Sequence, residues 1–188
     1  MYKNIEVKDM VRVPPEEFSR DIEEAVISSI KKKYEGYISK DIGIVIDVIE
    51  VHEMGEGIIV PGDGAAYYQL RFSLLVYKPE VGEIVYCSIK DIADFGAFLD
   101  LGAIDGMIHI SQTMDDFVSF SQEKVLSGRA TKKVLKVGEL CRARIVAISY
   151  KDLSNPRIGL TMRQPGLGKT EWIENDLKEK PKKVAKKE

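Results

Sequence analysis

The 188-residue sequence has little cysteine, little histidine and no long hydrophobic run. Its two cysteines, Cys87 and Cys141, are too few for a disulfide framework or a zinc site, and its two histidines do not suffice for a structural metal. No apolar stretch approaches the ~20 residues that a membrane-spanning helix needs. The first residues also contain no hydrophobic signal core. We therefore expect a cytoplasmic protein with no membrane contact, no metal and no cofactor.

A strong excess of positive charge is absent as well. The formal net charge is −2; residues 1–80 carry 10 basic and 15 acidic side chains, whereas residues 81–170 carry 12 basic and 10 acidic ones. A protein that wraps duplex DNA through charge alone would be far more basic. Any nucleic-acid contact should therefore be local, and it should lie in the second half of the chain.

The first 80 residues have the pattern of a small α+β domain. Pro14 and Pro15, followed by two glutamates, are typical of a helix start. Apolar residues then recur at every fourth position, at Phe18, Ile22, Val26 and Ile30. β-branched and aromatic residues predict long strands over residues 42–51 and 67–77. We expect these strands to form a long hairpin packed on the helix.

A cluster of glycines lies between the two predicted strands, at Gly55, Gly57, Gly62 and Gly64. A glycine-rich segment can hold a phosphate group, but this one lacks the GxxxxGK[ST] pattern, and no helical pattern follows it directly. A protruding loop is the better interpretation of the segment.

The sequence changes character at residues 79–82, where we place a domain boundary. Short strand patterns then follow at regular spacing, over residues 84–92, 96–101, 106–110, 140–149 and 158–162. Five short strands with glycine turns predict an all-β OB-fold barrel. The long connection over residues 111–137 is expected to contain some helix.

The end of the chain is expected to be a short appendage to this barrel. A helix is predicted around residues 169–178, docked through Trp172 and Ile173. The lysine-rich segment 178–188 is expected to be disordered. The resulting domains are residues 1–80, 81–165 and 166–188.

The segment DFGAFLDLG places Phe95 and Phe98 three residues apart. In a regular strand the two rings would point to opposite faces, but a bulge at Gly96 could restore a common face. Two exposed rings on a barrel form a stacking platform for unpaired bases, which His109 on the next strand could complete. Arginines of later strands could contact phosphates, namely Arg142, Arg144 and Arg157. In the structural alternative the rings belong to the core, the histidine is a satisfied structural residue and the arginines face solvent.

Residues for independent catalysis are not evident. The sequence has no Ser/His/Asp grouping in a nucleophile-elbow context, no metal-ligand spacing and no Walker loop. Asp115 and Asp116 could be interpreted as paired carboxylates for magnesium, but no third ligand is evident and adjacent acids in a loop are usually solvated. We expect a chain that is not an enzyme by itself.

Four spaced motifs resemble the RNA-binding OB-fold domain family named after ribosomal protein S1. They are GEIVYCSIKDIADFGAFLDLG, IDGMIHISQ, KVGELCRARIVAIS and RIGLTMR, in this order over residues 82–163. The resemblance implies an RNA face made of Phe95, Phe98 and His109, with Arg157 at the start of the last strand. Arg142 and Arg144 are further candidates. The chain departs from the family at Ser149, where an aspartate is common, and this departure affects the polar rim of the face.

The whole chain resembles the family of RNA polymerase stalk subunits, which includes the archaeal stalk protein E prime and the seventh subunit of eukaryotic RNA polymerase II. The matching pieces span nearly the full length, namely VRVPPEEF, KYEG, IVPGDGAAYY, VYKPEVGE, IHISQTMDD and LTMRQPGLGKTEWIE. The resemblance implies a truncated RNP-like first domain that docks on the polymerase core subunits through its glycine-rich loop. The loop residues concerned are Gly55, Gly57, Pro61, Gly62, Asp63 and Gly64.

The same resemblance implies partners and a role. A small helical stalk protein, named F, would complete the stalk, and the barrel would bind single-stranded nascent RNA. The stalk would support open-complex formation and elongation, while the catalytic residues of this nucleotidyltransferase complex would lie on other chains. The alternatives are an RNA-binding module of translation or RNA decay, and a scaffold that keeps the barrel but binds no RNA.

Overall fold

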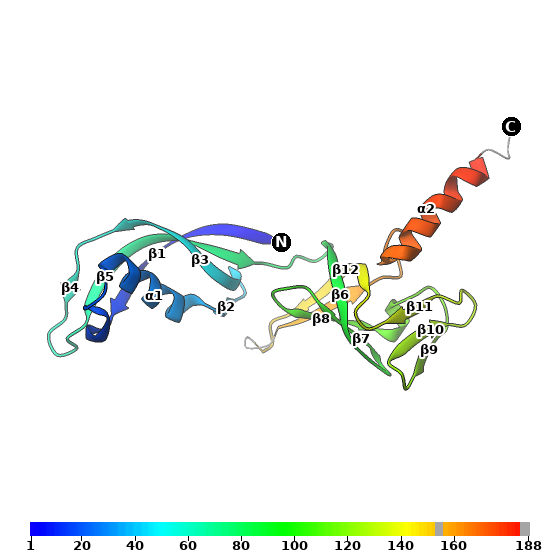
Figure 1. Ribbon diagram of the computed structural model, residues 1–188, viewed down its shortest axis with the longest axis horizontal. Coiled ribbons are helices and arrows are strands. Elements are labelled where there is room, and N and C mark those ends of the chain that lie inside the picture. Colours follow the sequence, from blue (N-terminus) through cyan, green and yellow to red (C-terminus); the bar gives the residue numbers. More distant parts are fainter. Residues whose placement is uncertain (153–155, 185–188) are drawn as a thin grey trace. The chain divides into compact units, whose positions relative to one another are not determined.

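The computed structural model describes residues 1–152 and 156–184, and the side chains as far as Lys178 (Figure 1). The chain divides into two compact units, Met1–Lys78 and Pro79–Glu188. The first unit is an α+β fold and the second is built around a β-barrel. The predicted fold class, an α+β domain followed by an OB-fold barrel, is confirmed.

The sheet of the first unit is antiparallel and has the order β1-β5-β3-β2, with the short strand β4 also paired to β5. Its strands are β1 (Tyr2–Val13), β2 (Ile38–Ser39), β3 (Gly43–Met54), β4 (Ile58–Ile59) and β5 (Ala66–Tyr77). The predicted hairpin corresponds to β3 and β5. Because β5 is paired on both sides, it supplies the deepest side chains of the core, among them Phe72 and Leu74.

Strand β1 was not predicted, although it pairs with β5 along its whole length. Its inward positions alternate as Ile5, Val7, Asp9, Val11 and Val13, and this period of two was the available signal. Asp9 interrupts the apolar series. Its carboxylate accepts hydrogen bonds from Lys33 and from the Tyr34 hydroxyl, which offset the cost of its partial burial.

The helix of the first unit begins later than predicted. Pro15–Glu17 form a short 3₁₀ helix, and the α-helix α1 spans Ile22–Tyr34. Its buried face consists of Ala25, Val26, Ser29 and Ile30. Phe18 precedes the helix and is 49% exposed, and Ile22 is 43% exposed. The predicted stripe is therefore wrong at these two positions, because Phe18 lies outside α1 and Ile22 is its first residue, before the buried face begins at Ala25.

Five strands of the described second unit close into a barrel. They are β6 (Ile84–Ala93), β7 (Gly96–Asp100), β8 (Asp105–His109), β12 (Leu140–Ser149) and β13 (Arg157–Thr161). The order β13-β8-β7-β6-β12 is closed by the pairing of β12 with β13. Inward side chains such as Ile89, Leu99, Ile108 and Ile145 fill the barrel.

The connection between β8 and β12 contains a small antiparallel sheet where helix was expected. A 3₁₀ turn (Ile110–Gln112) is followed by β9 (Val118–Ser121), β10 (Val125–Gly128) and β11 (Val134–Lys136). Leu126 and Leu135 are paired neighbours, both 0% exposed, and join the barrel core. The helix prediction is wrong beyond the 3₁₀ turn, because these buried leucines follow the pleat of a sheet.

The chain end adds the short strand β14 (Gly168–Lys169), paired with β12, and the helix α2 (Thr170–Val184). Trp172 packs against the barrel core and Ile173 is 9% exposed, so the predicted docking of this helix is confirmed. The helix extends beyond residue 178, which contradicts the expected disorder as far as Val184; residues 185–188 lie outside the described residues. Neither α-helix has the length and apolar character to cross a bilayer over the part of the chain that the structure describes.

Candidate nucleic-acid interface

The register between β7 and β8 determines which side chains share the outer barrel surface. Phe98 lies opposite Met107, and Gly96 lies opposite His109. The residues between them point inward, since Ala97 and Ile108 are 0% exposed. Because side chains alternate along a strand, Phe98, Met107 and His109 point outward together.

Phe95 joins this surface from the turn before β7. Ala93 pairs with Gly96, so Asp94 and Phe95 form a two-residue hairpin turn. The Phe95 ring is 45% exposed and stands edge-on to the Phe98 ring, with 5.9 Å between the ring centroids. The two rings therefore share a face, as predicted, but through the turn: the irregularity of the β6–β7 ladder lies between Ile89 and Asp91 and not at Gly96.

Gly96 has a different role, which is close approach of the two strands. A Cβ atom at this position would lie 2.0 Å from the carbonyl oxygen of Ile108, far inside van der Waals contact. The backbone amide of Ile110 donates to the carbonyl oxygen of Phe95 at 2.9 Å and closes the same corner. Glycine thus lets the strands approach closely enough to place His109 beside the Phe95 turn.

The His109 ring is exposed and oriented by its own turn. Its Nδ1 accepts a hydrogen bond from the backbone amide of Ser111 at 3.3 Å and lies 2.8 Å from the Ser111 hydroxyl. With Nδ1 as the acceptor, the proton of the neutral ring is on Nε2, which is available to a ligand.

Met107 is the platform residue that sequence reasoning missed. It is 36% exposed and lies across from Phe98. The alternation of Met107 with the inward Gly106 and Ile108 was the available signal. A thioether is polarizable and makes favourable contacts with aromatic rings, so it adds to a stacking surface. We call Phe95, Phe98, Met107 and His109 the platform.

The predicted arginines are not gathered at this platform. Arg157 is the first residue of β13, and the next residue, Ile158, pairs with Gly106 of β8. Arg157 therefore lies beside the beginning of β8, whereas His109 is at the end of that strand. Arg142 lies across from Tyr86, and its guanidinium stacks on that ring at 4.9 Å. The distance along β6 from Tyr86 to Asp91, the partner of Phe98, is about 17 Å at ~3.3 Å per residue.

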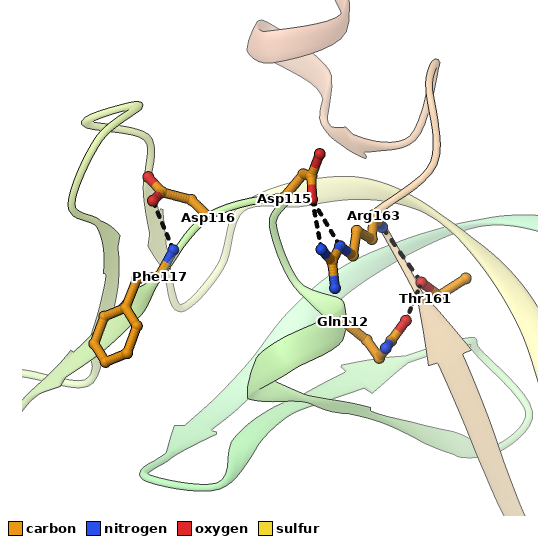
Figure 2. Close-up of polar contacts among 6 residues, drawn as sticks. All are labelled: Gln112, Asp115, Asp116, Phe117, Thr161 and Arg163. Carbon is orange, nitrogen blue, oxygen red and sulfur yellow. Dashed lines mark hydrogen bonds and ion pairs between the residues drawn. The ribbon is translucent and has the colours of Figure 1, made fainter.

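Arg144 lies nearer to the platform by register, because it pairs with Thr161 at the end of β13 that adjoins Ile108. Its Nε atom is buried and has no hydrogen-bond partner among the described residues. The Thr161 hydroxyl donates to the side-chain oxygen of Gln112, which covers this position from the 3₁₀ turn (Figure 2).

The two adjacent aspartates that suggested a magnesium site have separate roles. The Asp115 carboxylate pairs with Arg163, with its Oδ1 atom 2.7 Å from Nη2 (Figure 2). The Asp116 carboxylate accepts from the amides of Phe117, Ala130 and Thr131 and from the Thr131 hydroxyl, at 2.6–2.9 Å. No cluster of three metal-binding side chains occurs in the described ranges.

The glycine-rich loop of the first unit is held by one carboxylate. Asp63 accepts hydrogen bonds from the Arg12 guanidinium at 2.8 and 2.6 Å and from the Tyr67 hydroxyl at 2.6 Å. These contacts, above all the one from Arg12, hold the pKa of Asp63 well below its usual range. Val60, Pro61, Gly62 and Asp63 form a turn closed by the amide of Asp63, with Gly62 at a φ of 95°.

Other glycines of this loop also have geometric roles. A Cβ atom on Gly57 would lie 2.6 Å from the Tyr68 ring, and Gly64 has a φ of 70°. The amide of Gly55 donates to the carbonyl oxygen of Gln69 at 2.9 Å. The loop is therefore an ordered projection and presents the exposed aliphatic side chains of Ile58, Ile59 and Val60.

Comparison with known proteins agrees with this geometry. Residues 8–64 match the family described as "SHS2 domain found in N terminus of Rpb7p/Rpc25p/MJ0397", and residues 78–153 match the S1 RNA binding domain. The chain is 39% identical over 175 residues to DNA-directed RNA polymerase subunit Rpo7 of Saccharolobus solfataricus, covering 92% of this chain and 97% of that protein.

Two other relatives extend the comparison. The chain is 36% identical to subunit Rpo7 of Sulfolobus acidocaldarius, over 94% of this chain and 97% of that one. It is 25% identical to DNA-directed RNA polymerase III subunit RPC8 of Bos taurus, over 82% of this chain and 79% of that one. With both domains in the same order and nearly the full length matched, this chain belongs to the Rpo7 family of DNA-directed RNA polymerase subunits.

Proposed function

We propose that this chain is a non-catalytic stalk subunit, which docks on the polymerase core through its first unit and holds single-stranded nascent RNA on its barrel. The observation that carries the proposal is the platform of Phe95, Phe98, Met107 and His109. The small helical stalk protein F is its partner in the stalk, and the catalytic residues lie on other chains. The complex acts in the cytoplasm and supports open-complex formation and elongation.

The platform supports weak and sequence-tolerant binding. Stacking of a base on an aromatic ring contributes about 1–3 kcal/mol, and every base has a face that can stack. Two rings with few polar contacts, after the cost of ordering the RNA, give an affinity on the order of micromolar. Such contact suits a transcript that must slide over the surface. Attachment to the polymerase raises the effective concentration of RNA, so this affinity suffices.

The first unit supports docking on protein and not on RNA. Its residues 1–80 carry more acidic than basic side chains, which disfavours contact with phosphate. Its ordered loop presents Ile58, Ile59 and Val60, which are 60%, 64% and 42% exposed. A rigid loop with aliphatic side chains loses little conformational entropy on burial against another protein.

Fluorescence anisotropy with a labelled oligouridine tests the RNA half of the proposal. Phe95→Ala and Phe98→Ala should each weaken binding at least about fivefold without unfolding the chain. Phe18→Ala, which removes a similarly exposed ring from the first unit, is the matched control and should bind as the wild type does. Unchanged affinity of both platform variants, with the barrel intact by circular dichroism, would refute the assignment.

Reconstitution with a polymerase core that lacks this subunit tests the docking half. Ile59→Asp should abolish stable association, because a buried carboxylate without a partner is costly. Ile49→Asp, at an exposed position on β3, is the matched control. Equal loss of core association in both variants would place the contact elsewhere. In a separate pull-down, capture of ribosomal or exonuclease proteins by the tagged chain would contradict the stalk role.

A further inference from the structure

The small sheet between β8 and β12 carries a local excess of positive charge. Residues 117–137 contain five basic side chains and a single acidic one. Lys124 pairs with Asp91, but Arg129, Lys132 and Lys136 have no carboxylate partner among the described side chains. Cations without a carboxylate partner favour contact with phosphate groups.

The same sheet presents an exposed aromatic ring. Phe117 is 65% exposed, more than either phenylalanine of the platform. The Arg129 guanidinium lies over its ring, 4.4 Å from the centroid, and the Arg129 amide donates to the Phe117 carbonyl oxygen at 3.0 Å. Aromatic rings and guanidinium planes are the two protein surfaces on which unpaired bases stack.

The backbone that carries Phe117 and Arg129 is tightly held. The Asp116 carboxylate accepts a hydrogen bond from the Phe117 amide on one side (Figure 2). On the other side it accepts from the amides of Ala130 and Thr131. A Cβ atom on Gly128 would lie 2.6 Å from this carboxylate, so glycine is required for its approach. In Figure 2 the Phe117 ring projects away from the other side chains drawn. A ring fixed in an exposed position costs little entropy when it binds.

An ion pair connects this sheet to the platform. Lys124, in the turn between β9 and β10, lies 2.7 Å from Asp91 of β6, and Asp91 is the register partner of Phe98. Phe117 lies at the other end of β9, about 13 Å from this turn at ~3.3 Å per residue. The platform and Phe117 are thus separated by a span that a strand of a few nucleotides covers, within the ~4–16 nucleotides that one OB fold occupies.

We infer that the sheet of β9, β10 and β11 is a second contact for single-stranded RNA, in which Phe117 and Arg129 stack a base and Lys132 and Lys136 neutralise phosphates. The inference rests on the proposed RNA binding by the barrel and extends it. The RNA runs from the platform past the Lys124–Asp91 pair to Phe117. A protein partner at the same surface is the competing outcome; the local charge favours RNA.

Anisotropy titrations of the full chain with a short and a long oligouridine, of about 4 and 16 nucleotides, test the inference. Phe117→Ala should weaken binding of the long RNA about fivefold or more and leave the short one unchanged. Arg129→Gln should lower the slope of log affinity against log salt by about 1 for the long RNA only. Phe18→Ala and Arg20→Gln are the matched controls, since both remove exposed side chains of the first unit.

Each outcome supports or overturns the second contact. Long-RNA affinity that is unchanged in Phe117→Ala, or lost equally for both lengths, overturns the second contact. Loss of polymerase-core association in place of RNA affinity overturns it too and assigns Phe117 to a protein interface. If Phe95→Ala and Phe98→Ala leave the affinity for both RNAs unchanged while Phe117→Ala weakens binding of the long RNA, the platform is refuted and the second contact stands. If the wild type binds neither RNA, both are refuted.

Discussion

Replacing Gly96 by alanine tests how the barrel brings the platform together. The added Cβ atom would meet the carbonyl oxygen of Ile108 at 2.0 Å, and its carbonyl carbon and the His109 Cα at 3.0 and 3.1 Å. All three atoms belong to backbone, so no side chain can rotate away to relieve the clash. An ordinary contact begins near 3.4 Å, which means that β7 and β8 must separate by about 1.4 Å at this corner.

The cost of that separation can be estimated from its two parts. Overpacking costs about 1–3 kcal/mol. Weakening the corner hydrogen bond between Ile110 and Phe95 adds about 0.5–1.5 kcal/mol. We therefore expect Gly96→Ala to lose about 2–4 kcal/mol of unfolding free energy in the second unit. With a urea slope of about 2 kcal/mol per molar, the unfolding midpoint falls by about 1–2 M.

The assay can observe this unit alone. Trp172 is the single tryptophan of the sequence and packs against the barrel core, so its fluorescence follows urea unfolding of the second unit. Gly159→Ala is the matched control in β13, on the other side of β8, since its Cβ would lie an ordinary 3.5 Å from the Ala147 side chain. We expect the control to stay within about 0.5 kcal/mol of the wild type. Equal midpoints for the two variants would refute the reasoning.

Three further predictions follow from the polar contacts and from burial. Burial raises the pKa of the Cys87 and Cys141 thiols to about 12, so neither should react with iodoacetamide at pH 8 in the native chain, while both react in urea, as mass spectrometry can follow. Hydrogen bonds from Thr131 and neighbouring amides lower the pKa of Asp116 in the folded chain. The ionised carboxylate therefore contributes its full stabilisation of the fold above the unfolded pKa of about 3.9, and this contribution is lost as the pH falls through the lower folded pKa. The melting temperatures of the wild type and Asp116→Ala should consequently converge in acid. Asp63→Ala should speed hydrogen exchange of the amides at residues 60 and 62–64 without changing exchange in β5, because the contacts to Arg12 and Tyr67 hold only the loop. Unchanged exchange in the loop would show that its glycine turns alone keep it ordered.

The barrel strands could be predicted because each carries a complete local signal. Residues such as Gly106, Met107 and Ile108 alternate inward and outward, and glycines mark the turns. Strand β1 was harder, since its pattern is interrupted by Asp9, and its partner strand β5 lies more than fifty residues further along the chain. The contacts of Asp9 with Lys33 and Tyr34, which make its inward position acceptable, exist only after α1 has docked.

The small sheet of β9, β10 and β11 could not be predicted, for a different reason. Its strands have three or four residues each, too few to display a period of two. Their order depends on the turns at Lys124 and Lys132, which adopt positive φ values of 57° and 54°. Lysine is not a typical residue for this conformation, so the sequence carries no turn signal there.

In the candidate site, too, some positions follow from local sequence and others depend on how distant strands pair. Phe98 and His109 lie on adjacent strands and Phe95 lies in the turn before β7, so their shared surface could be inferred from local sequence. The positions of Arg142, Arg144 and Arg157 depend on the stagger with which β12 and β13 close the barrel, and no local pattern encodes that stagger. Arg157 and His109 accordingly lie at opposite ends of β8, although a motif-based view places them in one site.

Asp63 and Asp116 have the same physical role, which is to hold the backbone of a loop in place, in two unrelated loops. Each carboxylate accepts several hydrogen bonds from its own loop or a neighbouring strand, and each fixes a segment that carries exposed apolar side chains. Exposed apolar groups on a mobile loop would bind weakly, because each contact would have to offset the ordering of the loop. With the loop already ordered, modest contacts at Ile59 or Phe117 suffice. Substituting either aspartate should therefore weaken binding at the exposed apolar side chains of the segment that it fixes.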